Sequence, residues 1–153
     1  MTVYVVRHAR AGSRRAWKHD DTLRPLSKVG RAQAAAIATR LSRKSIEVVV
    51  SSPYVRCTAT VEPVAAKRRI EVETSDALAE GARLSQALRL FEKVQDREAV
   101  LCTHGDVIED LLDHLGRHGV KLRDHRMEKG SIWVFDVGRD GVEKARYMPP
   151  SSA

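Results

Sequence analysis

Hydrophobic and polar positions follow two different periods along the chain, and the shorter one predicts strands. Short apolar or alternating runs rich in β-branched residues predict six strands, at residues 2–6, 48–50, 70–73, 99–102, 132–137 and 142–147. The last two flank Gly138-Arg139-Asp140-Gly141, which predicts a hairpin turn. Residues 9–25 are rich in Arg, Gly, Ser and Asp, which indicates a long loop after the first strand.

The longer period, with apolar residues three and four positions apart, predicts four helices. Ser27 is expected to cap the first helix, which runs to about Arg43. The second is expected to begin with Ser52 as its N-cap and Pro53 at its first helical position, and Pro63 is expected to kink or shorten it. The same period predicts two further helices, at residues 84–94 and 106–115.

This alternation of strands and helices predicts βαβ crossovers, and so an α/β fold with a mostly parallel central sheet. We expect one domain over residues 1–148, because a chain of 153 residues has an ordinary single-domain length and contains no internal repeat. Residues 149–153, Pro-Pro-Ser-Ser-Ala, are expected to form a disordered tail.

Composition indicates the class of protein and its cellular location. Apolar residues make up 42% of the chain and charged residues 31%, as in globular proteins. The chain has neither an apolar run of about 18 residues nor a basic leader, so we expect no membrane span and a cytoplasmic location. Cys57 and Cys102 lack a C-x-x-C spacing and are expected to be buried as small apolar residues.

The formal net charge of +7 attracts anions, which fits a solvated basic surface, a nucleic-acid partner or a phosphorylated substrate. Only 5% of the residues are aromatic, and no stacking motif lies among the basic residues, which argues against nucleic acid. No H-E-x-x-H motif is present, so the sequence predicts no metal site.

Chemistry-bearing residues follow three of the predicted strands. Arg7 and His8 follow the first strand, and Arg56 lies one helical turn after the second. His104 and Gly105 follow the fourth strand. Because ligands of parallel sheets bind beyond the carboxyl ends of the strands, we expect these five residues to meet at one edge.

These residue types suit a phosphate site. A neutral imidazole can attack phosphorus and form a phosphohistidine, which is the role we assign to His8. Arg7 and Arg56 present planar forks of donors that match phosphate oxygens, and His104 is a further donor. Gly105 permits a close approach of the backbone at a helix N-terminus, where N–H groups also bind anions. A structural histidine or a surface arginine would explain any one of these residues, but not their joint occurrence.

Three motifs resemble those of the histidine phosphatase superfamily, which has the phosphoglycerate mutase-like fold. Residues 7–11, Arg-His-Ala-Arg-Ala, resemble its R-H-G/A motif, and residues 51–60 resemble its S-S-P-x-x-R-x-x-x-T motif. Residues 103–105, Thr-His-Gly, resemble the third motif. The short length and the Leu-Arg-Pro-Leu-Ser run at 23–27 are most similar to small phosphohistidine phosphatases of the SixA type. The chain is also similar to the phosphatase domain that follows a Nudix domain in some actinobacterial proteins.

The resemblance implies a three-layer α/β/α sandwich and a metal-independent phosphatase without a cofactor. It implies that His8 is the nucleophile and that Arg7, Arg56 and His104 bind the phosphate.

The resemblance also suggests a proton donor and a substrate loop. Glu80 stands where larger members of the superfamily carry their acid, and Asp106 is its rival, because another branch uses an aspartate after the second histidine. Ser13, Arg14 and Arg24 lie in the loop over the site, where we expect them either to contact the substrate or to form a solvated basic surface.

The leading hypothesis is a phosphatase that acts on protein phosphohistidine or on a small phosphorylated metabolite. A nucleotide phosphatase or a broad phosphomonoester phosphatase is the alternative substrate class. A mutase of the same fold is less favoured, because mutases usually carry longer insertions around their substrate. A non-catalytic module that binds phosphoprotein or nucleic acid is the alternative from another class. The sequence leaves the oligomeric state open.

Overall fold

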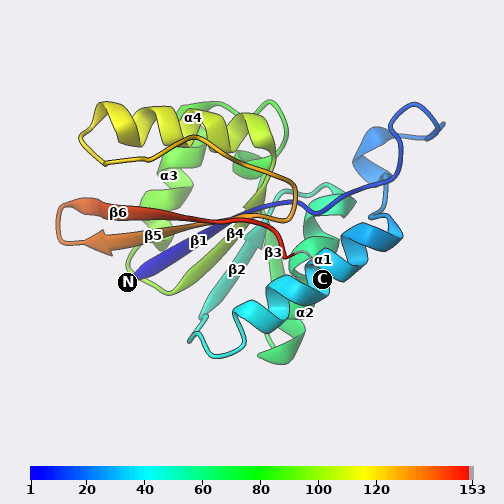
Figure 1. Cartoon of the computed structure of the whole chain (residues 1–153), viewed down its shortest axis with the longest axis horizontal. Helices are drawn as coiled ribbons and strands as arrows, with labels where there is room; N and C mark the ends of the chain where they lie inside the picture. The colour runs from blue at the N-terminus through cyan, green and yellow to red at the C-terminus, as the bar shows by residue number, and fades with distance from the viewer. Residues whose placement is uncertain (152–153) are drawn as a thin grey trace.

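The computed structural model describes residues 1–151 and has one six-stranded sheet at its centre (Figure 1). The strand order is β3-β2-β4-β1-β5-β6. The strands are β1 (Thr2–Arg7), β2 (Val48–Ser51), β3 (Val72–Thr74), β4 (Ala99–Thr103), β5 (Ile132–Gly138) and β6 (Gly141–Met148). The first four strands in the sheet order are parallel, whereas β5 is antiparallel to both β1 and β6. The predicted mostly parallel sheet and the hairpin at its edge are therefore confirmed.

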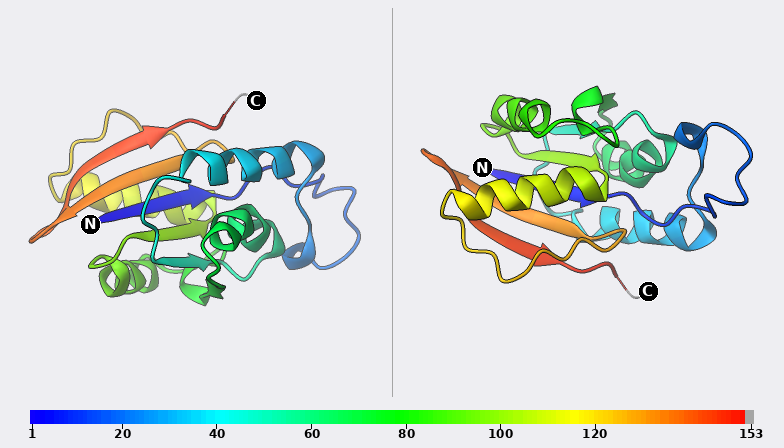
Figure 2. Two further views of the ribbon diagram at one scale, coloured as in Figure 1. Left: turned by 90° about the horizontal axis from the view of Figure 1, so that it is seen from below. Right: turned by 90° about the horizontal axis from the view of Figure 1, so that it is seen from above.

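Helices cover both faces of this sheet, as the two views of Figure 2 show. Helices α1 (Lys28–Arg40) and α2 (Val55–Lys67) lie on one face. Helices α3 (Leu84–Val94) and α4 (Gly105–Arg117) lie on the other. Two short 3-10 helices, η1 (Asp21–Leu23) and η2 (Asp76–Leu78), lie in the connections. The expected three-layer α/β/α sandwich is thus the architecture observed.

The central strand β1 shows why residues 3–6 form a continuous buried run. Its side chains alternate between the two faces of the sheet. Tyr4 and Val6 belong to the core beneath α1 and α2, whereas Val3 and Val5 belong to the core beneath α3 and α4. A strand buried on both faces has no solvent side to mark with polar residues, which explains the continuous apolar run.

The expected start of α2, with Ser52 as the N-cap and Pro53 at the first helical position, was wrong. Ser52 does not cap the helix, which begins at Val55 after Tyr54. The hydroxyl of Ser52 instead accepts the Tyr54 N–H at 3.2 Å and forms a hydrogen bond with His104. Pro63 lies inside the helix and does not end it. Burial of the apolar face of α2 offsets the hydrogen bond that the missing proline N–H cannot make.

The third strand is shorter than predicted because its first residues complete the preceding helix. The N–H groups of Arg68 and Ile70 both donate to the carbonyl of Ala65. Arg69 between them adopts a positive φ of 55°. These residues fold back on the end of α2, so pairing with β2 begins only at Val72.

The end of the described chain contacts α1. Nη1 of Arg40 donates to the carbonyl of Pro149 at 2.6 Å. The tail predicted for residues 149–153 extends past the described residues, since 152 and 153 lie outside them. Within residues 1–151, no helix combines the length and the apolar character needed to cross a membrane.

The loop between β1 and α1 projects beyond the end at which β1 finishes (Figure 2). Gly30 in the first turn of α1 brings the helix against this loop. A Cβ atom at residue 30 would lie 1.8 Å from the carbonyl oxygen of Arg10. Ser27 caps the helix as predicted, and its N–H donates to the same carbonyl.

Gly30→Ala is expected to lower the free energy of unfolding by about 1–3 kcal/mol, because the added methyl group overpacks the backbone of Arg10. Gly12→Ala is the matched control, since a Cβ there meets nothing within 4 Å. Its expected change is below about 0.5 kcal/mol. Urea unfolding of both variants measures the difference, and equal stabilities would contradict the close packing of α1 on the loop.

Candidate active site

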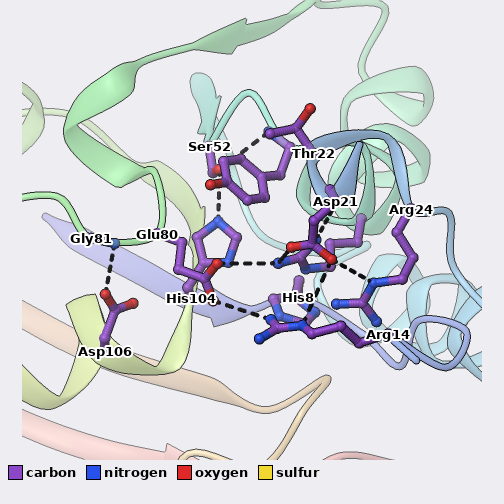
Figure 3. Close-up of polar contacts among 12 residues, drawn as sticks. His8, Arg14, Asp21, Thr22, Arg24, Ser52, Glu80, Gly81, His104 and Asp106 are labelled. Carbon is purple, nitrogen blue, oxygen red and sulfur yellow. Dashed lines mark hydrogen bonds and ion pairs between the residues drawn. The ribbon is translucent and has the colours of Figure 1, made fainter. Parts of the chain in front are cut away.

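A cavity of about 250 Å³ lies beyond the carboxyl ends of β1, β2 and β4, at the edge predicted from the sequence. It is lined by Arg7, His8, Arg14, Arg24, Arg56, Glu80, His104, Gly105, Asp106 and Lys129. Figure 3 shows how several of these side chains converge. The structure therefore brings together the predicted site residues from separate parts of the chain, with the exception of Ser13.

His8 is held in one tautomer. Its ring is 6% exposed, and Nδ1 lies 2.8 Å from the carbonyl oxygen of Ala9. Because a carbonyl only accepts, Nδ1 carries the hydrogen, and Nε2 keeps a free electron pair. Burial lowers the pKa of His8 to about 3, with help from His104, Arg56 and Arg7 and against the opposing effect of the Ala9 hydrogen bond. His8 is thus a neutral imidazole at neutral pH, as a nucleophile requires.

His104 is held through its other ring nitrogen. Its Nε2 lies 2.8 Å from Oγ of Ser52. Since that oxygen already accepts the N–H of Tyr54, its own hydrogen is free to be donated to Nε2. Nδ1 then carries the hydrogen, and in the described part of the chain it has no hydrogen-bond partner. The ring contacts His8 edge-on, with 5.3 Å between the centroids, so the two imidazoles lie side by side.

The two arginines are fixed by backbone carbonyls. Nη1 of Arg7 donates to the carbonyl of Met127 at 2.7 Å. The guanidinium packs against Gly105, where a Cβ would lie 3.0 Å from it, so this glycine permits the close approach that was expected. Nη1 of Arg56, which is 1% exposed, donates to the carbonyl of Asp21 at 2.9 Å. Nε of both arginines is buried without a partner among residues 1–151.

Thr60, the last residue of the second motif, connects the two halves of the site. Its hydroxyl donates to the carbonyl of Arg56 at 2.6 Å and accepts the N–H of Ala9 at 2.9 Å. The helix that carries Arg56 is therefore tied to the backbone next to His8. This geometry explains why the threonine follows the arginine by one helical turn.

Carboxylates surround the mouth of the cavity. Asp21 accepts from Nη2 of Arg56 at 3.1 Å and from Nε of Arg24 at 2.9 Å. Glu80 pairs with Arg14 at 3.4 Å and lies 3.7 Å from Nη2 of Arg56. Glu80 therefore stands at the cavity, where a proton donor to a leaving group would have to be.

Asp106 does not cap its helix, because the N-cap of α4 is His104. Its carboxylate instead accepts the N–H of Gly81 at 2.7 Å (Figure 3). Asp106 thereby holds the segment that carries Glu80 through one of its two carboxylate oxygens.

The predicted loop residues have different surroundings. Arg14 is exposed and reaches the cavity mouth. Arg24 is buried, and Nη1 donates to the carbonyl of Gly12 at 2.6 Å, so it also holds the loop. Ser13 accepts the N–H of Ala16 and does not line the cavity. Cys57 and Cys102 are buried and free, as expected.

Three residues of the site were missed by sequence reasoning, namely Asp21, Ser52 as a partner of His104, and Lys129. The only signal for Ser52 was its place in the second motif. Over residues 1–151, no group of three or more His, Cys, Asp or Glu side chains lies together so that it could hold a metal ion.

The sequence profile of the histidine phosphatase superfamily (branch 1) matches residues 3–83. The chain is 34% identical over 155 aligned positions to an 8-oxo-(d)GTP phosphatase of Mycolicibacterium smegmatis. The match covers 97% of this chain and 48% of that protein. A second relative, an uncharacterized protein of Mycobacterium tuberculosis, is 40% identical over 65 residues, which are 42% of this chain and 32% of that protein. The chain spans about half the length, or less, of these relatives.

Solved structures share the whole fold. A putative phosphohistidine phosphatase SixA from Agrobacterium tumefaciens superposes with a TM-score of 0.74 at 22% identity, over 97% of each chain. A protein histidine phosphatase SixA complexed with tungstate gives a TM-score of 0.77 at 18% identity, over 97% of this chain and 95% of the other.

Ser52→Ala is expected to lower kcat for any phosphate substrate about fivefold, because loss of a hydrogen bond worth about 1 kcal/mol frees the His104 ring to turn. Steady-state kinetics measures the loss, and the thermal midpoint shows whether the fold is retained. Ser42→Ala, at an exposed serine after α1, is the control. Unchanged kcat in Ser52→Ala would show that the hydroxyl does not orient His104.

Proposed function

The chain belongs to the histidine phosphatase superfamily, and from this premise we propose that it hydrolyses phosphate bonds through a phosphohistidine on His8, without a metal ion. One observation carries the proposal. The hydrogen bond from Nδ1 to the Ala9 carbonyl leaves Nε2 of a neutral, buried imidazole with a free electron pair inside a cavity lined by arginines.

The first step transfers the phosphoryl group to His8. Nε2 attacks phosphorus, and the bond between phosphorus and the leaving oxygen breaks with its electrons on that oxygen. Arg7, Arg56 and His104 each have a buried N–H without a partner among the described residues. We assign these N–H groups to donate to the equatorial oxygens, where charge has to be stabilised.

The second step returns the free enzyme. Water attacks the phosphorus of the phosphohistidine, the P–N bond breaks with its electrons on Nε2, and inorganic phosphate leaves. Glu80 is the group we assign to protonate the leaving oxygen in the first step. Its carboxylate stands 3.7 Å from Arg56, at the mouth through which the leaving group departs.

Two substrate classes have support. The fold shared with phosphohistidine phosphatases favours a phosphohistidine protein. The relative that is an 8-oxo-(d)GTP phosphatase favours a nucleotide, which is the alternative expected from the sequence. Both have leaving groups that depend little on a proton donor. The cytoplasmic location stays a prediction.

His8→Ala is expected to lower kcat/KM for para-nitrophenyl phosphate by about a thousandfold or more, because the nucleophile is lost. The wild-type protein is expected to keep its activity in excess chelator. His125→Ala, at an exposed histidine paired with Asp113, is the control and should match the wild type. Loss of activity in the presence of chelator would contradict the metal-independent mechanism. Activity that is retained in His8→Ala would contradict the covalent step.

Glu80→Gln is expected to slow the hydrolysis of an alkyl phosphate more than that of para-nitrophenyl phosphate. An alkyl phosphate needs its leaving oxygen protonated, so its kcat should fall about a hundredfold, whereas that of para-nitrophenyl phosphate should stay within about threefold. Parallel assays of the two substrates measure the ratio, with Glu92→Gln on exposed α3 surface as the control. Equal losses on both substrates would remove Glu80 from the role of acid.

A further inference from the structure

The catalytic cavity adjoins a second, larger hollow, and one lysine borders both. The second hollow has a volume of about 680 Å³ and is lined by Arg10, Ala11, Ser27, Val29, Gln33, Glu128, Lys129 and Pro150. Lys129 also lines the cavity that contains His8. A ligand that reaches from one space into the other therefore has to pass this side chain.

The backbone of Lys129 is fixed relative to the nucleophile. The N–H of Gly130 donates to the carbonyls of both Arg7 and His8, each at 3.1 Å. Gly130 has a φ of +83°, which favours glycine. The side chain of Arg7 holds the other end of the same turn through the carbonyl of Met127. Lys129 is thus anchored to the strand end that carries the catalytic residues.

Gln33 holds Arg10 against the same turn. Its side chain is buried, and Oε1 accepts the N–H of Arg10 at 2.9 Å. Nε2 of the same amide donates to the carbonyl of Lys129 at 3.2 Å. A Cβ at Gly130 would lie 3.0 Å from this amide, so the contact depends on the glycine. One buried side chain therefore fixes the backbones of two basic residues on either side of it.

These two cations are not neutralised by the residues that the structure describes. No carboxylate of residues 1–151 forms an ion pair with Lys129 or Arg10, and Glu128 in the same hollow pairs with Arg126. Burial lowers the pKa of Lys129, and the cations Arg7, Arg24, Arg10 and Arg14 lower it further. Lys129 and Arg10 therefore remain available to bind a second anionic group.

We propose that Lys129 and Arg10 form a second phosphate subsite next to His8, so that the preferred substrate is a phosphoanhydride, with a second phosphate adjacent to the one transferred. This inference rests on the proposed function and names its substrate class. In the reaction, Nε2 of His8 takes the terminal phosphoryl group, and the bridging P–O bond breaks with its electrons on the leaving phosphate. Lys129 and Arg10 stabilise the charge that develops there.

The test compares two substrates in the full chain. Lys129→Gln should lower kcat/KM for a nucleoside diphosphate about tenfold or more, as expected for the loss of a hydrogen bond between two charged groups. The same change should lower kcat/KM for para-nitrophenyl phosphate less, so that the ratio of the two constants falls about fivefold or more, since that substrate has no second phosphate. Lys93→Gln, at an exposed lysine in the last turn of α3, is the matched control. Arg10→Gln should repeat the selective loss.

A binding measurement separates this inference from the proposed function. By calorimetry, inorganic pyrophosphate should bind the wild type more tightly than inorganic phosphate does, and Lys129→Gln should remove that preference. This result would support the subsite even if His8→Ala left hydrolysis intact and so refuted the covalent mechanism. Equal losses on both substrates, no loss on either, or equal binding of pyrophosphate and phosphate by the wild type would each overturn the subsite.

Discussion

The burial of positive charge beside two imidazole rings is the constraint on which this structure depends. Arg56 is 1% exposed, and a buried guanidinium is costly unless its hydrogens find acceptors. Asp21 meets this need with both its carbonyl and its carboxylate, and Met127 does so for Arg7. The N–H groups that the described residues leave without partners belong to the same cluster, and a phosphate would supply acceptors for them. Burial keeps His8 neutral by lowering its pKa, and the same cations add to this effect.

Much of the fold could be predicted, because the pattern of apolar residues reflects burial directly. The helix at residues 84–94 was predicted with the bounds it has, since α3 has a sharply divided apolar and polar surface. The convergence of Arg7, Arg56 and His104 on His8 followed from one rule, that the carboxyl ends of parallel strands meet. The site residues could be predicted where the apolar pattern of the strands and the topology of the sheet both place them at the same edge.

The features of the fold and the site that the sequence did not predict depend on contacts between residues far apart in the chain. Ser52 has every local feature of an N-cap, yet its hydroxyl bonds to a histidine 52 residues away, and the helix begins later. Asp106 likewise has the position of a helix-capping carboxylate but holds the backbone of Gly81. Neither partner is visible in a one-dimensional pattern, because each is brought close only by the packing of another element. The same applies to Lys129, which Gln33 and Gly130 fix in place from two sides.

The phosphorus–nitrogen bond in a trapped phosphoenzyme shows directly which nitrogen of His8 attacks phosphorus. The protein is denatured rapidly during turnover, and the phosphohistidine isomer is identified by phosphorus–nitrogen coupling in NMR. Because Nδ1 donates to the Ala9 carbonyl, the phosphoryl group is expected on Nε2 of His8. Phosphate on Nδ1, phosphate on another residue, or turnover with no phosphoenzyme would contradict the account.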